Sequence, residues 1–218
     1  MKFSFKYEPI PVIIIRDLFS SEVNKKILAE SISNEKKFSH SVTGEGDKET
    51  VSEFRTNLVA FYDNIYETDR TKSILLESID GLFSNNEEFK EAMASAPYPI
   101  NEFSHTNYHE TQVSRYGDQG QKYNYHIDAF DSRTRTVTMV YYFNEEPKPY
   151  TGGTLSVTRS PIYKGNPIDE TQQVIDIEPE NNMAVIFGSH VAHRVSPTTS
   201  PSDFNKGRFS VNCWIGSR

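Results

Sequence analysis

The sequence predicts a mainly β domain with flanking helices, built as an antiparallel sandwich or jelly roll. From about residue 108 onward it holds six or more short runs rich in Val, Ile, Thr, Tyr and Phe, separated by clusters of Gly, Pro, Asn and Asp. No segment of helical period lies between these runs. A parallel α/β sheet needs such helices between its strands, so the pattern favours antiparallel strands.

The first hundred residues combine one strand with two helices. Residues 12–15 form a short aliphatic run typical of a strand, whereas residues 20–33 and 71–83 repeat their apolar positions with a helical period. The apolar positions are Val23, Ile27, Leu28 and Ile32 in the first segment, and Ile74, Leu75, Ile79, Leu82 and Phe83 in the second. Residues 41–53 are polar, contain two glycines and lack any period, so we expect a loop that is a candidate lid.

The strand-like runs continue to the end of the sequence. They cover residues 111–116, 134–144, 152–159, 172–177, 182–188 and 208–215. At 218 residues, with no repeat and no linker, the chain is expected to form a single domain. We expect residues 1–105 to give helical and strand support and residues 106–218 to form the core.

Composition excludes several classes of protein. With 23 Lys and Arg against 30 Asp and Glu, the formal net charge is -7, and the scattered basic residues argue against nucleic acid as a partner. The single cysteine, Cys213, excludes an internal disulfide framework. The aliphatic run in residues 10–17 is too short to span a bilayer and lacks a signal-cleavage pattern. We therefore expect a cytoplasmic protein with no membrane partner and leave its oligomeric state open.

A possible metal site begins with His126 and Asp128 in the stretch KYNYHIDAFD. On an extended strand, residues two apart point to the same side, which suits two ligands of one metal. On its own, such a pair is more often a surface or hydrogen-bonded pair than a metal site. A second cluster, FGSHVAHRVSP, offers His190 and His193. Two histidines and one carboxylate on one face of an octahedron are typical of non-haem Fe(II) oxygenases, although a zinc hydrolase could use the same residue types.

Arg208 opens the last strand-like run, GRFSVNCWIGSR. Strand alternation places Phe209, Val211, Cys213 and Ile215 on one face, and Arg208, Ser210, Asn212 and Trp214 on the other. A guanidinium that points into a barrel is costly unless a carboxylate meets it. Arg208 therefore indicates an anionic co-substrate, unless it reaches solvent or a carboxylate of the protein.

Several motifs in one order resemble the Fe(II)- and 2-oxoglutarate-dependent dioxygenases, specifically their prolyl 4-hydroxylase-like branch. They are SRYGDQGQKYNYHID, VTMVYYFNEE followed by TGGTLSV, AVIFGSHVAHRVSP and GRFSVNCWIG, and together they cover about residues 110–215. FRTN, residues 54–57, is similar to an Arg-Thr-Ser type segment of the same branch. The segment between His193 and Arg208 is longer than in compact members, and we expect it to form an exposed excursion.

The resemblance implies a role for each matching residue. His126, Asp128 and His193 would bind iron, and Arg208 would bind the distal carboxylate of 2-oxoglutarate. His190 would lie beside the site or at the surface. The remaining matches are Tyr116 and Tyr142 as co-substrate contacts, Val140 and Leu155 as apolar walls, and Tyr123, Arg135 and Trp214 as substrate contacts. The two pocket tyrosines could also be plain core aromatics, and Arg135 a solvated strand-end charge.

The same resemblance implies a double-stranded β-helix (jelly-roll) core with N-terminal helices packed on it. The implied activity is hydroxylation of a substrate C–H bond, most directly of a prolyl residue in a protein or peptide, with release of succinate and CO2. Fe(II), 2-oxoglutarate and O2 would take part, with ascorbate in support. The alternatives are the same chemistry on a free amino acid or other small molecule, a non-enzymatic jelly-roll binding module, and a zinc hydrolase, for which no Glu general base stands beside the ligands.

Overall fold

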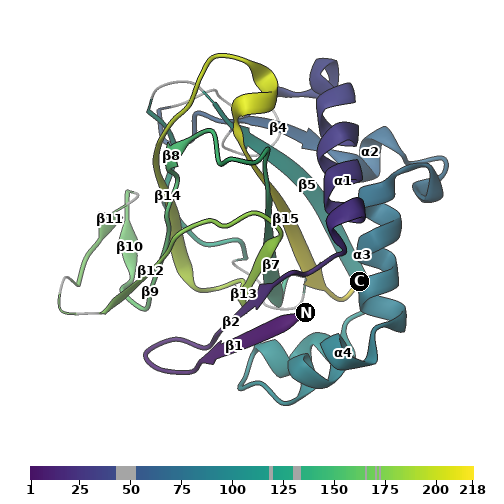
Figure 1. Ribbon diagram of the computed structural model, residues 1–218. Helices are drawn as coiled ribbons and strands as arrows, with labels where there is room; N and C mark the ends of the chain where they lie inside the picture. The colour runs from purple at the N-terminus through teal and green to yellow at the C-terminus, as the bar shows by residue number, and fades with distance from the viewer. Residues whose placement is uncertain (43–52, 118–119, 130–133, 165, 170, 172) are drawn as a thin grey trace.

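Two antiparallel sheets face each other in the protein, and helices cover the outer side of the larger sheet (Figure 1). This computed structural model describes residues 1–218 apart from 43–52, 118–119, 130–133, 165, 170 and 172. The arrangement confirms the predicted mainly β fold with a jelly-roll core and flanking helices.

The larger sheet has eight strands and contains both ends of the chain. In spatial order these are β1 (Lys2–Lys6), β2 (Val12–Arg16), β13 (Met183–Gly188), β7 (Val137–Phe143), β15 (Arg208–Gly216), β5 (Tyr108–Tyr116), β4 (Leu58–Phe61) and β3 (Ser39–His40). The central strands β7, β15 and β5 are long and mostly buried, so the side chains that they carry have well-packed surroundings.

The smaller sheet closes the other side of the core. It contains β12 (Val174–Ile177), β9 (Leu155–Thr158), β14 (Ala192–Thr199) and β6 (Gln121–His126), and β8 (Thr151–Gly152) also pairs with β14. A hairpin of β10 (Ile162–Tyr163) and β11 (Asn166–Pro167) projects away from the two sheets (Figure 1).

Strand alternation divides the apolar residues into two cores. On β7, Met139, Tyr141 and Phe143 pack beneath the helices, whereas Val140 and Tyr142 face the smaller sheet. Because successive side chains of a strand point to opposite faces, one buried strand serves both layers.

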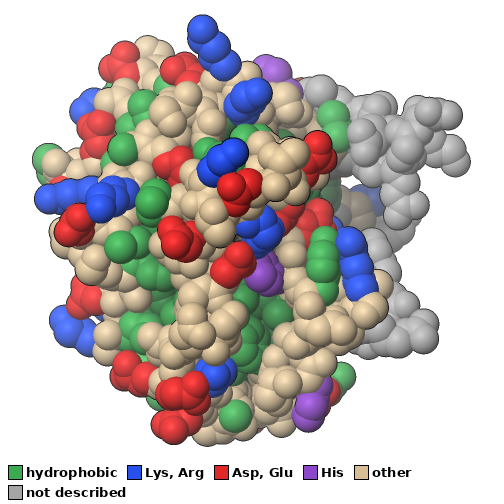
Figure 2. Space-filling model, turned by 90° about the vertical axis from the view of Figure 1, so that its right-hand side faces the viewer, with side chains coloured by type: hydrophobic (Ala, Val, Ile, Leu, Met, Phe, Trp, Pro, Cys, Tyr) green, Lys and Arg blue, Asp and Glu red, His purple; other side chains and the backbone are tan. Residues whose placement is uncertain are grey.

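The helices cover the outer face of the larger sheet. They are α1 (Ser21–Ser33), α2 (Tyr62–Ile65), α3 (Ile74–Asn85) and α4 (Glu87–Ala94), with short 3-10 turns at Glu35–Lys37, Arg70–Lys72, Ile100–His105 and Phe204–Lys206. The predicted helices α1 and α3 begin where the side chains of Ser20 and Ser73 accept backbone N–H bonds. Acidic and basic side chains intermingle over this side of the molecule (Figure 2).

Several elements differ from the sequence expectations. Strands β1, β3 and β4 and helices α2 and α4 were not predicted. The expected excursion between His193 and Arg208 is wrong for its first half, because residues up to Thr199 belong to β14. This strand looks like a loop in sequence since its outward positions are polar, and a shift in its register between Val195 and Thr198 accommodates Pro197.

The candidate lid, residues 41–53, lies mostly outside the described residues. Within the part of the chain that the structure describes, no helix combines the length and the apolar character needed to cross a bilayer.

Candidate active site

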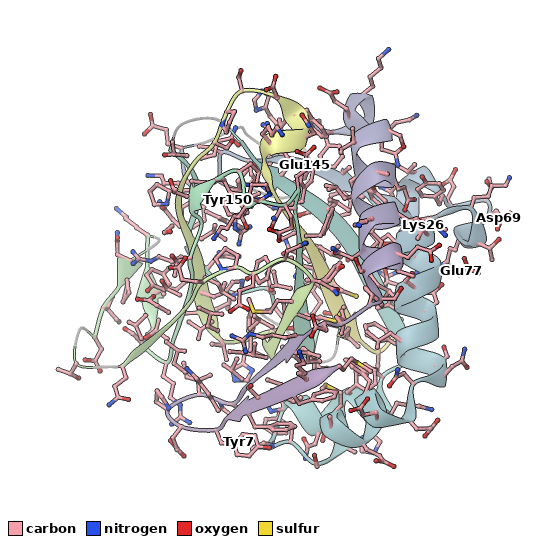
Figure 3. All side chains as sticks on the ribbon, viewed as in Figure 1. Tyr7, Lys26, Asp69, Glu77, Glu145 and Tyr150 are labelled. Carbon is pink, nitrogen blue, oxygen red and sulfur yellow. The ribbon has the colours of Figure 1, made fainter. Side chains whose placement is uncertain are left out.

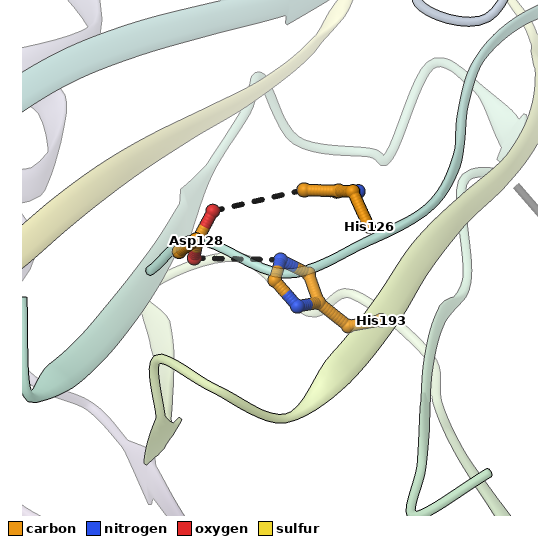
Figure 4. A group of neighbouring side chains, drawn as sticks. All are labelled: His126, Asp128 and His193. Carbon is orange, nitrogen blue, oxygen red and sulfur yellow. Dashed lines mark ion pairs between the residues drawn. The ribbon is translucent and has the colours of Figure 1, made fainter. Parts of the chain in front are cut away.

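His126, Asp128 and His193 converge in the space between the sheets (Figure 4). His126 ends β6 and His193 lies opposite it on β14, where the two residues are register partners. The Nε2 atom of His126 lies 3.7 Å from Oδ1 of Asp128, and Nε2 of His193 lies 3.4 Å from Oδ2. One ligand atom from each side chain falls within 4.8 Å of the others, which is the spacing of a group that can share one ion.

Both imidazoles present the same nitrogen to this centre. Nδ1 of His126 lies 2.8 Å from the carbonyl oxygen of Asn124, and Nδ1 of His193 lies 2.9 Å from that of Val191. A carbonyl can only accept, so each Nδ1 carries the proton and donates it. Each Nε2 is then left with a lone pair directed at the centre, as metal binding requires.

Asp128 is held by two neighbouring residues rather than by strand geometry. Strand β6 ends at His126, so Asp128 stands just beyond it, and the assumed strand alternation is wrong at this position. Its backbone N–H donates to the carbonyl of Ser189 at 2.9 Å, and its Oδ2 accepts from the hydroxyl of Thr138 at 2.8 Å. The Thr138 and Ser189 hydroxyls lie 2.9 Å apart, which completes a small network that orients the carboxylate.

Burial sets the protonation of His126. Its pKa is held well below the ordinary value, first by desolvation and then by the neighbouring His193. The imidazole is therefore neutral at neutral pH. Two imidazoles and one carboxylate form the donor set that suits a divalent non-haem iron.

Arg208 lies farther into the core and is 0 % exposed. Its Nε donates to the carbonyl of Gly153 at 3.0 Å and its Nη1 to the hydroxyl of Ser210 at 3.2 Å. The guanidinium carbon lies 4.9 Å from the ring centroids of both Tyr116 and Tyr142. The charge is thus packed and oriented, but only neutral groups meet it.

The atoms around Arg208 fit an incoming carboxylate. Of the buried polar atoms that have no hydrogen-bond partner among the described residues, four lie around Arg208: its own Nη2, the hydroxyls of Tyr142 and Tyr150, and Oγ1 of Thr198. Tyr150 lies among the side chains that fill the space between the sheets (Figure 3). Buried polar groups are rarely left without partners, so a cluster of donors beside a guanidinium indicates an absent acceptor.

The tyrosine hydroxyls near Arg208 keep their protons. Burial raises the pKa of Tyr142, and it raises that of Tyr150 to about 12, although the charge of Arg208 acts in the opposite direction on both. A Cβ at Gly153 would lie 2.4 Å from Cδ of Arg208, so a residue with a side chain would displace the guanidinium. The pocket is therefore shaped to donate hydrogen bonds to an anion.

The other predicted pocket residues, Val140, Leu155 and Tyr116, are all buried. Val140 and Leu155 are buried in the same apolar cluster as Tyr142. Tyr116 is buried against Arg208, so its ring contacts the expected co-substrate pocket.

The predicted substrate contacts lie on the open side of the metal group. The ring of Tyr123 stacks on His126 with centroids 3.5 Å apart and planes 13° apart. The guanidinium of Arg135 lies 4.1 Å from the ring centroid of Trp214, and its Nη2 pairs with Glu110 at 2.9 Å. Arg135 is therefore an ordered, paired residue rather than a solvated strand-end charge.

His190 and His193 separate clearly in the structure. His193 is buried in the metal group, whereas His190 is exposed and lines the rim of the same cleft. Sequence reasoning assigned no role to Thr138, Ser189, Tyr150 or Thr198, although Thr138 and Ser189 lie within motifs of the resemblance. Arg55 also lines the cleft, and the similarity of FRTN to an Arg-Thr-Ser segment was its only signal.

A family model described as the 2OG-Fe(II) oxygenase superfamily matches residues 111–216. The fold and the clustered site are similar to those of Fe(II)- and 2-oxoglutarate-dependent oxygenases, the family that the motifs of the sequence also resemble. These oxygenases use Fe(II), 2-oxoglutarate and O2. More particularly, the chain is 29% identical over 204 residues to an uncharacterised PKHD-type hydroxylase of Synechocystis sp.. The match covers 92% of this chain and 61% of that relative, so the chain spans less than two thirds of its length.

Solved structures show the same fold. A Pseudomonas putida prolyl-4-hydroxylase is 20% identical, with a TM-score of 0.63 and coverage of 96% of this chain and 94% of that one. A prolyl hydroxylase from Trichoplax adhaerens, in complex with a hypoxia inducible factor peptide, is 18% identical, with a TM-score of 0.61 and coverage of 94% and 83%. The α-ketoglutarate-dependent epimerase SnoN is 11% identical, with a TM-score of 0.61 and coverage of 97% and 78%, so the fold alone does not define the reaction.

Proposed function

We propose that this chain hydroxylates a prolyl residue in a protein or peptide, with release of succinate and CO2. In this proposal His126, Asp128 and His193 hold Fe(II), and Arg208 anchors the distal carboxylate of 2-oxoglutarate. The bound iron, with 2-oxoglutarate and O2, supplies the oxidation that places oxygen on a C–H bond.

The size of the cleft beside the metal group is the observation that favours a polypeptide. The cleft has a volume of about 2020 Å³ and extends from His126 and Asp128 past Tyr123 and Trp214 to the rim. Pockets for small ligands are usually about 300–1,000 Å³. A cleft larger than that has room for a chain segment on both sides of the reacting residue.

The similarities to known proteins favour the same kind of substrate. The chain is similar to a PKHD-type hydroxylase and to two prolyl hydroxylases, one of them with a bound peptide. These relatives share a reaction class, hydroxylation, rather than one substrate.

The side chains of the cleft have distinct tasks in the proposed reaction. The backbone carbonyls behind His126 and His193 keep both Nε2 atoms available for the metal. The hydroxyl of Thr138 keeps Asp128 turned toward the same centre. Tyr123 and Trp214 supply flat apolar surfaces on which a proline ring can pack, which excludes water from the reacting carbon.

The direct test combines the purified protein with Fe(II), 2-oxoglutarate and ascorbate, which we expect to support turnover. Succinate is measured with and without a panel of proline-containing peptides and with free L-proline. The expected result is peptide-dependent succinate and a peptide heavier by one oxygen atom. Succinate with L-proline and with no peptide would instead assign a small-molecule substrate.

Two variants check the assignment of the site. Asp128→Ala should abolish succinate formation while the protein stays folded, because it removes one of three metal ligands. His190→Ala is the matched control, since it removes an exposed histidine from the same cleft and should change the rate much less. The opposite ranking, or a folded and iron-loaded protein that never forms succinate, would contradict the proposal.

A further inference from the structure

Arg55, Arg135 and Arg208 lie near the candidate site, and they differ in the groups that neutralise their charge. Arg135 has a built-in partner, because its Nη2 lies 2.9 Å from a carboxylate oxygen of Glu110. Arg208 has only neutral partners, and the proposed co-substrate supplies its carboxylate. Arg55 also has only neutral partners among the described residues, but it lines the cleft beside the metal group.

Arg55 is a buried cation held by neutral groups. It is 7% exposed, and its Nε donates to Oδ1 of Asn57 at 2.9 Å. Its Nη2 donates to Oε1 of Gln112 at 2.6 Å and lies 3.5 Å from the hydroxyl of Ser114. Among the residues that the structure describes, no carboxylate lies within ion-pair distance of it. A buried guanidinium without a counter-charge is costly, so such a residue indicates an anion that arrives from outside.

The location of Arg55 makes a substrate the source of that anion. Arg55 lines the cleft, and its guanidinium carbon lies 4.5 Å from the ring centroid of Tyr123. Tyr123 in turn stacks on the metal-group residue His126. The ring of Tyr123 therefore has the guanidinium of Arg55 on it and also stacks on a residue of the metal group. The unpartnered atoms around Arg208 already account for the distal carboxylate of 2-oxoglutarate.

We propose that Arg55 forms a subsite for a carboxylate of the substrate, next to the carbon that is hydroxylated. This inference rests on the proposed function in one respect, namely that the reaction takes place at the His126, Asp128 and His193 group. It goes beyond that function because it assigns a charge to the substrate. The carboxylate can belong to an acidic side chain of a peptide or to a free amino acid.

The other charges of the cleft support an anionic substrate. The described residues that line it include the cations Lys37 and Arg159, although the whole chain carries a formal net charge of -7. The acidic side chains among those lining residues are Glu110, which pairs with Arg135, and Asp128, which belongs to the metal group. An excess of positive charge among these described lining residues favours acidic ligands.

Binding without turnover gives the sharpest test. The protein is loaded with Fe(II) and 2-oxoglutarate under nitrogen, and probes are titrated while the fluorescence of Trp214 is followed. Trp214 is the sole tryptophan of the chain and lines the cleft, so its signal reports on this region. Calorimetry of the same titrations provides an independent dissociation constant.

The probes are two matched pairs that differ in charge. The first pair is the blocked peptides acetyl-Gly-Asp-Pro-Asp-Gly-amide and acetyl-Gly-Asn-Pro-Asn-Gly-amide. The second pair is L-proline and L-prolinamide. A preference within the first pair identifies a peptide side chain as the source of the carboxylate, and one within the second pair identifies a free carboxylate.

We expect one acidic probe to bind about tenfold or more tightly than its neutral twin, as is typical of hydrogen bonds to charged groups. Arg55→Gln should remove this preference, and Arg55→Lys should keep part of it because the charge remains without the planar fork. Arg159→Gln, the matched control, removes an exposed charge from the same cleft and should preserve most of the preference. Equal binding within both pairs, or a preference that survives Arg55→Gln, would overturn the inference.

Two further readouts separate this inference from the proposed function. The comparison of each acidic probe with its neutral counterpart on the unaltered protein tests for a carboxylate preference even if Arg55→Gln fails to fold. The dissociation constant of 2-oxoglutarate in Arg55→Lys shows whether Arg55 binds the co-substrate instead, and a large rise there would also overturn the inference. Peptide hydroxylation without any charge preference would sink the subsite and leave the proposed function intact.

Discussion

Replacing Arg208 by Met should remove the selectivity of the protein for the distal carboxylate of 2-oxoglutarate. The variant keeps an unbranched, buried side chain but loses the charge and the Nη2 atom that has no partner in the structure. One hydrogen bond to a charged group contributes about 1.5–3 kcal/mol. At about 1.4 kcal/mol per tenfold change, this predicts a loss of about 10- to 100-fold in affinity for 2-oxoglutarate.

The assay compares 2-oxoglutarate with 2-oxopentanoate, which has a methyl group in place of the distal carboxylate. Dissociation constants of both 2-oxo acids for the Fe(II)-loaded protein, with and without the substitution, form a thermodynamic cycle. The unaltered protein should prefer 2-oxoglutarate strongly, and Arg208→Met should bind the two acids almost equally. The cycle isolates the interaction between Arg208 and the carboxylate from any general loosening of the pocket.

Arg115→Met is the matched control. Arg115 is equally buried on the neighbouring strand β5, but it faces the other side of the sheet and donates to the carbonyls of Phe204 and Asp203. Its loss should lower stability without altering the preference between the two acids. If Arg208→Met weakened both acids by the same factor, Arg208 would be a structural residue and the assigned co-substrate pocket would be wrong.

Two smaller substitutions test the surroundings of the site, and a third tests the contact between His109 and Asp80. Tyr150→Phe should raise the Kd of 2-oxoglutarate about threefold to tenfold, yet leave the Tm of the ligand-free protein unchanged or higher, because it removes a buried hydroxyl without a partner. Thr138→Val should weaken Fe(II) binding about tenfold in metal titrations, because Asp128 loses the hydroxyl that orients it. Burial holds the pKa of His109 below its ordinary value, although the neighbouring carboxylate of Asp80 acts in the opposite direction. The unfolded chain therefore binds more protons below about pH 6.5, stability falls as the pH drops through that value, and His109→Gln should make urea unfolding less sensitive to acid.

Each of these expectations has a clear contrary result. A lower Tm of ligand-free Tyr150→Phe would mean that its hydroxyl already has a partner. Unchanged metal affinity in Thr138→Val would show that the backbone alone orients the carboxylate. An acid sensitivity of His109→Gln equal to that of the unaltered protein would assign the loss of stability to other groups.

The metal group could be predicted from sequence because its signals are local. His126 and Asp128 are two residues apart, and the alternation of β15 correctly put Arg208 on the inner face. Spacing alone could not rank His190 against His193; the resemblance did so, and the structure places only His193 in the group. The amphipathic helices α1 and α3 could be predicted for the same reason, because the spacing of apolar residues that indicates each helix lies within one short segment.

The missed residues depend on contacts between distant segments. Tyr150 and Thr198 meet Arg208 only after β8, β14 and β15 have packed, and no spacing in the sequence encodes that meeting. Strand β14 was hidden because its outward residues are polar and it contains a proline. Arg55 was noticed only through FRTN, and its lack of a counter-charge becomes visible when its neighbours Asn57 and Gln112 are known.

The backbone carbonyls behind the two histidines have a consequence for how such a protein can diverge. Asn124 and Val191 contribute main-chain atoms, so a substitution at either position leaves the acceptor of the Nδ1 proton in place. Substitutions of side chains in the cleft therefore do not remove the groups that set the tautomers of His126 and His193. Under the proposed function, mutations of Tyr123, Arg135 or Arg55 would change substrate selection while His126 and His193 keep the tautomers that metal binding requires.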